Sequence, residues 1–147
     1  MQITSNTRYL LDTNILIYSV DSASPFHTKA KETILQIKDK QAEGVVAQQN
    51  ILEFSHVLMR TYGISPTEVV EDSKAILEDF SLITPLPSTL PLFLSFVEET
   101  NKKNVVHDLY LAATMLDNGI STIITANEQD FLSIPGISVY NPWAMKD

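Results

Sequence analysis

The chain has 147 residues, of which 44% are hydrophobic and 19% charged, and its formal net charge is −8. This composition is typical of one globular domain with a sizeable core, and it excludes a disordered chain or a coiled coil. The acidic charge argues against binding of nucleic acid through a broad basic surface, and the lack of cysteine excludes disulfides, thiolate metal sites and cysteine nucleophiles.

The amino terminus, MQITSNT, lacks the basic start and apolar centre of a signal peptide. No run of about 20 apolar residues follows anywhere in the sequence, so we expect no membrane span. These features predict a cytoplasmic protein. No repeat, low-complexity tract or long linker interrupts the chain, which predicts a single domain over residues 1–147.

The first half of the chain predicts strands that alternate with helices. YLLD (9–12) is a short buried strand, and TNILIYSV (13–20) is a helix for which Asp12 or Thr13 provides the cap. After a loop, residues 27–40 form a helix, and GVVA (44–47) is a second strand. A helix over 49–60 has an apolar face and an opposite polar stripe, formed by Gln49, Glu53, His56 and Arg60.

The second half continues the alternation. Ser65 as a cap, Pro66 in the first turn and Glu68 three residues after the cap together predict a helix start. The later elements expected are a strand at SLITPL (81–86), a helix over Leu90–Val97, a helix at HDLYLAATMLD (107–117) that stops at Gly119, and strands at TIITA (122–126) and ISVY (137–140).

The expected strands are short and apolar on both faces, as in parallel sheets that helices cover on both sides. The sequence therefore predicts an α/β fold. We expect a three-layer sandwich with a mainly parallel sheet of four to five strands and helices on both faces.

Three acids fall where the chain leaves such a sheet. Asp12 ends the first strand, Glu53 lies in the first turns of the helix after GVVA, and Asp108 opens the helix that is free of charge up to Asp117. Carboxylates brought together repel one another, and a hard divalent ion such as Mg²⁺ relieves the repulsion. An acidic magnesium site suits phosphodiester hydrolysis.

Each residue alone also has an ordinary structural interpretation. Asp12 suits a helix cap, Glu53 a solvated helix face and Asp108 a favourable charge at a helix start. Asn127 and Asp130, after TIITA, are typical turn residues. His56 and His107 adjoin the acids, but we expect them to be surface or supporting residues. The case for a site therefore rests on the joint pattern.

The joint pattern resembles that of PIN domains, in particular the VapC-type toxins of toxin–antitoxin pairs. The motifs that carry the resemblance are YLLDTNILIYSVD, NILEFSHVL, HDLYLAATMLDNG and TIITANEQDFLSIPGISVYNPW, in family order and over nearly the whole chain. The resemblance implies a PIN-like α/β sandwich, an acidic site for Mg²⁺ or Mn²⁺, cleavage of RNA, a small antitoxin partner and a homodimer.

Residue by residue, Asp12, Glu53 and Asp108 match the three acids of the family motif. Thr13 and Asn14 match the polar pair after the first acid, and Thr125 matches the hydroxyl residue of the last motif. In one place the chain departs from the pattern, because Asn127 stands where many members carry a fourth acid. An amide brings no charge, so the departure favours hydrolysis with one metal ion. Asp130 is the acid that would replace the missing carboxylate, whereas the family pattern, in which an aspartate before phenylalanine here is commonly structural, implies a structural role for it.

We therefore hypothesise a metal-dependent endoribonuclease in which Asp12, Glu53 and Asp108 are catalytic. Asp12 and Asp108 are the expected metal ligands, and Thr13, Asn14, Thr125, Asn127 and Asp130 support them. The alternative is a non-catalytic PIN-like module that binds RNA or protein. A phosphatase of the haloacid dehalogenase type is disfavoured, because DTN lacks the second aspartate that such enzymes use.

Overall fold

The computed structural model describes residues 2–144. The strands are β1 (Arg8–Leu11), β2 (Glu43–Ala47), β3 (Ser81–Ile83), β4 (Thr122–Ile124) and β5 (Ser138–Tyr140). The helices are α1 (Thr13–Val20), α2 (His27–Asp39), α3 (Gln48–Arg60), α4 (Pro66–Asp79), α5 (Thr89–Glu99), α6 (Val106–Asp117) and the short 3₁₀ turn η1 (Glu128–Asp130).

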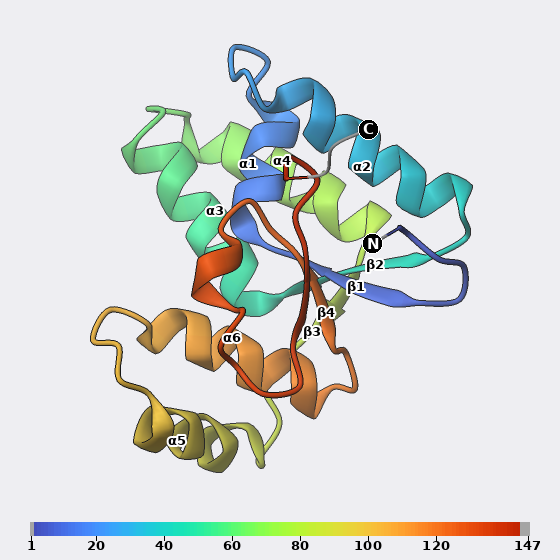
Figure 1. Cartoon of the computed structure of the whole chain (residues 1–147). Helices are drawn as coiled ribbons and strands as arrows, with labels where there is room; N and C mark the ends of the chain where they lie inside the picture. The colour runs from blue at the N-terminus through green and yellow to red at the C-terminus, as the bar shows by residue number, and fades with distance from the viewer. Residues whose placement is uncertain (1, 145–147) are drawn as a thin grey trace.

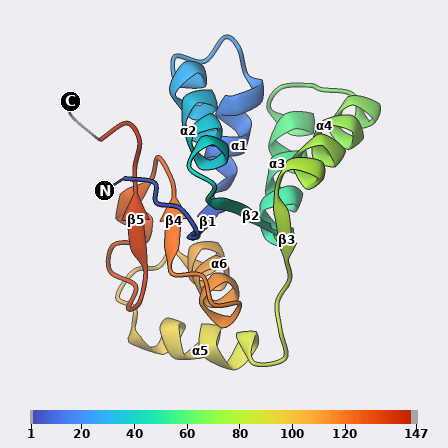
Figure 2. The ribbon, with the colours of Figure 1, turned by 90° about the vertical axis from the view of Figure 1, so that its right-hand side faces the viewer.

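All five strands belong to one parallel sheet with the order β3-β2-β1-β4-β5. The central strand β1 pairs on one side with β2 and on the other with β4, so that Leu10 lies opposite both Val45 and Ile123. Figure 2 shows the strands side by side between two groups of helices. The predicted three-layer sandwich with a parallel sheet of up to five strands is confirmed.

Alternating side chains of the strands fill two separate cores. On one face, Tyr9 and Leu11 of β1 pack with residues of α1 to α4. On the other face, Leu10 packs with residues of α6 and with partly buried side chains of α5. Because successive side chains of a strand point to opposite faces, a short strand that is apolar throughout contributes to both cores. Figure 1 shows α5 and α6 on the side of the sheet away from α1 and α2.

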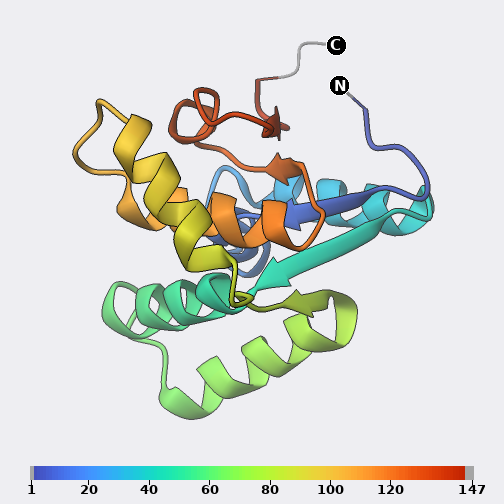
Figure 3. The same ribbon diagram turned by 90° about the horizontal axis from the view of Figure 1, so that it is seen from below.

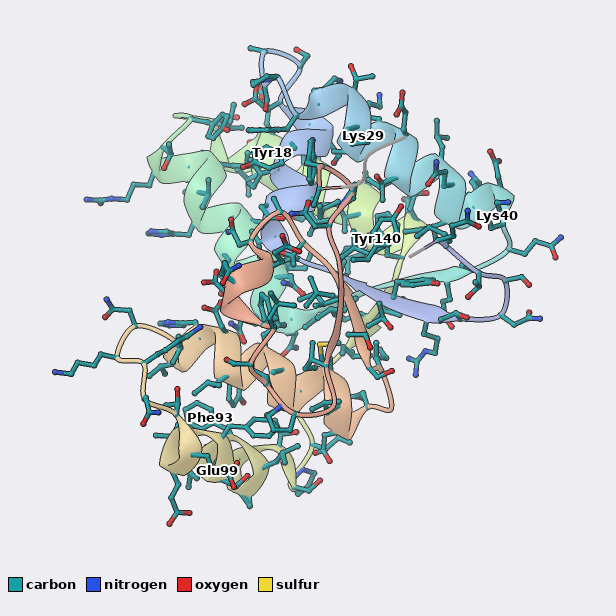
Figure 4. All side chains as sticks on the ribbon, viewed as in Figure 1. Tyr18, Lys29, Lys40, Phe93, Glu99 and Tyr140 are labelled. Carbon is teal, nitrogen blue, oxygen red and sulfur yellow. The ribbon has the colours of Figure 1, made fainter. Side chains whose placement is uncertain are left out.

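The two helices on the second face pack against each other as well as covering the sheet. The rings of Phe93 in α5 and Tyr110 in α6 meet edge to face, with centroids 5.5 Å apart. Figure 3 shows α5 lying beside α6, and Figure 4 shows the Phe93 side chain between the two ribbons. No helix within residues 2–144 is long and apolar enough to cross a membrane.

The predicted helix starts are confirmed, and two strand predictions are too long. Asp12 is the cap of α1, and the Ser65 hydroxyl accepts a hydrogen bond from the backbone N–H of Glu68 at the start of α4. The strand expected over 81–86 ends at Ile83, because Pro85 has no N–H to continue the ladder. The strand expected over 122–126 ends at Ile124, where the chain turns into the site.

Candidate active site

The site lies at the carboxyl end of the sheet, where the central strand β1 and its neighbour β4 end. From β1 the chain leads to β2 on one side, whereas β4 occupies the other side, and ligands of open α/β sheets typically bind where the strand order reverses in this way. Asp12 follows β1 directly and Thr125 follows β4 directly. The backbone N–H of Asp12 donates to the carbonyl of Ile124 at 3.0 Å, which holds the two strand ends together.

Asp12 is buried, and several donors hold its carboxylate. Oδ1 accepts from the backbone N–H of Thr13 at 2.8 Å, and Oδ2 accepts from the Thr125 hydroxyl at 2.8 Å and the Asn14 amide at 3.4 Å. Burial raises the pKa of Asp12 to about 6, although the bonds from Thr125 and Thr13 lower it. Asp12 is therefore both a helix cap and a desolvated acid at the site.

Glu53 of α3 is held from two sides. The Thr13 hydroxyl donates to Oε2 at 2.9 Å, and the Gln49 amide donates to Oε1 at 2.9 Å. The buried Asn50 amide donates to the Thr13 oxygen at 3.2 Å, which leaves the hydroxyl proton of Thr13 for Glu53. Asn50 is fixed in turn because its Oδ1 accepts from the backbone N–H of Ala47 at 2.8 Å.

Asp108 lies in the first turn of α6 and is half-buried. Burial, and after it the negative charges of Asp130, Asp12 and Glu53 in that order, raise the pKa of Asp108 to about 6. The neighbouring His107 has a weaker, lowering effect. The charges of Glu53 in α3 and Asp130 in η1 therefore act on both Asp108 and Asp12, the residue that caps α1.

The turn after β4 closes the site through a network of short polar bonds. The Thr125 hydroxyl, besides donating to Asp12, accepts from the Asn14 amide at 3.2 Å and from the backbone N–H of Asn127 at 3.0 Å. Asn14 also accepts from the backbone N–H of Ala126 at 3.2 Å. The Asn127 side chain is exposed, whereas Asp130 follows in η1, which Figure 1 shows between α3 and α6.

Asn50 and Gln49 also belong to the site, although the sequence pattern places Gln49 only on a polar stripe and does not indicate Asn50 at all. Gln49 lies four residues before Glu53 on the same helix, a spacing at which side chains meet, so this contact could have been predicted. Asn50 contacts Thr13, 37 residues away, and no local pattern indicates that pairing.

The donor chemistry fits a hard divalent ion. Asp12 and Asp108 both have raised pKa values, partly because of neighbouring acids, and a cation between them would favour their ionised forms. In residues 2–144, no group of three or more His, Asp or Glu side chains is arranged to hold a metal ion. Mg²⁺ commonly takes only one or two carboxylates and keeps several waters, so a site for this ion does not need three such side chains.

Fold and site together define an α/β domain with a cluster of acids at the carboxyl edge of a parallel sheet. The model of the PIN domain family matches residues 9–137. The chain belongs to the PIN domain family. A search of curated proteins by sequence gave no match.

Solved structures share the fold at low sequence identity. DNA-bound VapBC from Salmonella typhimurium aligns with a TM-score of 0.71 and 14% identity over 92% of this chain and 98% of that chain. A toxin–antitoxin complex from Klebsiella pneumoniae aligns with a TM-score of 0.66 and 23% identity over 93% of this chain and 99% of that chain. VapC20 from Mycobacterium tuberculosis is described as a toxin that cleaves the sarcin–ricin loop. It aligns with a TM-score of 0.63 and 14% identity over 78% of this chain and 86% of that chain.

Proposed function

We propose that the protein is a magnesium-dependent endoribonuclease that cleaves RNA phosphodiesters. The proposal rests on one observation, that Asp12, Glu53 and Asp108 interact at the carboxyl edge of the sheet. The pKa values of Asp12 and Asp108 are both raised to about 6 there. Shifts of this size, caused by burial and by specific neighbouring charges, are typical of functional acids. Membership of the PIN domain family supports the same conclusion.

Asp12 and Asp108 are the residues that would hold Mg²⁺, or Mn²⁺ in its place. When bound, the ion supplies a Lewis acid for a phosphoryl oxygen and makes a bound water more acidic. Glu53, whose two oxygens are fixed by Thr13 and Gln49, orients the attacking water and accepts its hydrogen bond. Catalysis is thus assigned to Asp12, Glu53 and Asp108.

The remaining site residues have supporting roles in this proposal. Thr13, Asn14 and Thr125 hold the carboxylate of Asp12 in place through the bonds described above. Asp130 adds negative charge beside Asp108 and Asp12. Asn127 borders the site, where its amide oxygen is available to orient a water or the ion.

We further propose that the nuclease is the toxin of a toxin–antitoxin pair, acts as a homodimer and is inhibited by a small cognate antitoxin. The support is the shared fold with the VapBC and toxin–antitoxin structures named above. Because RNA is the proposed substrate, we place the protein in the cytoplasm. The predicted test is growth arrest on expression of the wild type, absent for Asp12→Asn and relieved by a small gene encoded next to this one.

The nuclease activity is tested by mapping cleavage sites on total RNA with purified protein and Mg²⁺. We expect cleavage by the wild type, loss of at least a hundredfold in rate for Asp12→Asn and Asp108→Asn, and loss of cleavage with EDTA. Asp39→Asn, at the exposed end of α2, is the matched control and should cleave like the wild type. A folded wild type that neither binds Mn²⁺ nor cleaves RNA would instead indicate a non-catalytic module.

A further inference from the structure

The side chain of Gln49 links two of the acids of the site. Its amide nitrogen donates to Oε1 of Glu53 at 2.9 Å and to the backbone carbonyl of His107 at 2.8 Å. Glu53 is the acid on α3, and His107 immediately precedes Asp108 on α6. One amide therefore joins the helix that carries the second acid to the start of the helix that carries the third.

The orientation of this amide is determined by its partners. A carboxylate and a backbone carbonyl only accept hydrogen bonds, so the nitrogen of Gln49, and not its oxygen, must face both of them. The oxygen Oε1 is left buried, without a hydrogen-bond partner within the described residues. The reverse orientation would place this oxygen against two acceptors, so the amide nitrogen must be the atom that faces Glu53 and His107.

A matching contact holds Glu53 from the opposite side. Thr13, which directly follows Asp12, donates to Oε2 of Glu53 at 2.9 Å. The carboxylate of Glu53 thus bonds directly to Thr13, the residue after Asp12. Through Gln49 it is also linked to His107, the residue before Asp108. These two contacts fix the carboxylate of Glu53 relative to the chain segments that carry Asp12 and Asp108.

We propose that Gln49 is a positioning residue, which sets the separation of Glu53 and Asp108 and thereby the ability of the site to bind a divalent ion and cleave RNA. The inference rests on the proposed function. Gln49 does not touch the ion or the substrate in this proposal but acts through the carboxylate of Glu53 and the backbone of α6. Residues that orient the groups of a metal site typically change metal affinity or activity by 10- to 100-fold when they are replaced.

Replacement of Gln49 by Met tests the proposal, because Met has a similar length and lacks both N–H donors. The probe is Mn²⁺ titrated into the RNA-free protein and followed by electron paramagnetic resonance. We expect Mn²⁺ affinity to fall about tenfold for Gln49→Met, and kcat on RNA to fall by a similar factor with KM nearly unchanged. Gln48→Met, at the exposed neighbouring position on the same helix, is the matched control and should behave like the wild type.

The outcomes separate this inference from the proposed function. If the wild type binds Mn²⁺ and cleaves RNA, and Gln49→Met does both equally well, the positioning role is wrong and the nuclease stands. If the wild type does neither, the proposed function fails. Should Gln49→Met not fold, Gln49→Ala provides the same measurement, and wild-type Mn²⁺ affinity in that variant overturns the role of Gln49.

Discussion

The hydroxyl of Thr125 donates a hydrogen bond of 2.8 Å to Oδ2 of Asp12, although the two residues are 113 positions apart in the sequence. The bond crosses between the ends of β4 and β1, and both side chains are buried. A buried carboxylate is stable in its ionised form only where donors replace the lost water. Thr125 is therefore one of the groups that allow a charged aspartate at this position.

Replacing Thr125 by Val should destabilise the protein by about 1–3 kcal/mol, because it removes a donor from a buried carboxylate without changing the shape of the side chain. Since the Thr125 bond lowers the pKa of Asp12, the variant should also raise that pKa further above about 6. The loss of stability should then be larger at pH 7.5, where Asp12 must ionise, than at pH 5. Urea unfolding at both pH values measures the difference.

Thr125→Ser is the control for this prediction, because it keeps the hydroxyl and removes only a methyl group. Thr125→Ser should therefore keep most of the free energy of unfolding that Thr125→Val loses. An equal loss of stability for Thr125→Val at pH 5 and pH 7.5 would contradict the assigned role, because it would show that Thr125 does not favour the charged form of Asp12.

Asp108 should make the stability of the metal-free protein depend on pH. Burial, together with the neighbouring acids, raises the pKa of its carboxyl group from an ordinary 3.8 to about 6 in the folded protein. As pH rises from about 4 to 6, the unfolded state loses its proton first, so the folded state loses stability relative to it, and above that range the loss is constant. Asp108→Asn removes this effect.

We therefore expect Asp108→Asn and the wild type to have similar stability near pH 4, and the variant to be more stable by about 1–2 kcal/mol at pH 8 without metal. Saturating Mg²⁺ should reverse the order, because it stabilises only a protein that binds it. Thermal unfolding with EDTA and with Mg²⁺ provides the measurement. A variant that is less stable than the wild type at pH 8 in EDTA would show that the charge of Asp108 is compensated without a cation.

Some parts of this site follow from the sequence and others need the three-dimensional structure. The role of Asp12 as a cap was predictable, because an acid that separates a short strand from a helix has few other local functions. The Thr125 bond to Asp12 was not, because it depends on β1 and β4 being neighbours, and the strand order does not follow from local periodicity. The Asn50 contact with Thr13 depends in the same way on the pairing of β1 with β2.

Substitution of Gly44 in β2 tests how tightly the Phe80 ring packs against this strand. A Cβ atom placed on Gly44 would lie 2.6 Å from Cδ1 and 2.9 Å from Cε1 of Phe80, so the ring occupies the space that a side chain would need. Gly44→Ala should destabilise the protein by about 1–3 kcal/mol, the usual cost of overpacking. In the double variant Gly44→Ala/Phe80→Leu, the loss should be smaller than the sum of the single losses, since the shorter side chain can move away. Additive losses in urea unfolding would show that the Phe80 ring does not cause the clash.

Asp130 and Asn127 occupy the same turn, and the structure gives them different electrostatic roles. The charge of Asp130 raises the pKa of both Asp108 and Asp12, and among the charges acting on Asp108 it has the largest effect. Asn127 has no charge and an exposed side chain. If the site binds a divalent ion, the attraction of that ion should depend on Asp130 more than on Asn127.

Asp130→Asn should therefore weaken Mn²⁺ binding about tenfold, a change within the range expected for groups around a metal site, and Asn127→Ala should change it by less than threefold. Asp130→Asn should also lower the pKa of Asp108 and so reduce the loss of stability between pH 4 and pH 6. Mn²⁺ titration and unfolding at several pH values measure these two effects independently. A weaker Mn²⁺ affinity in Asn127→Ala than in Asp130→Asn would assign the fourth position of the site to the amide, because the exposed side chain would then contribute more to ion binding than the nearby charge.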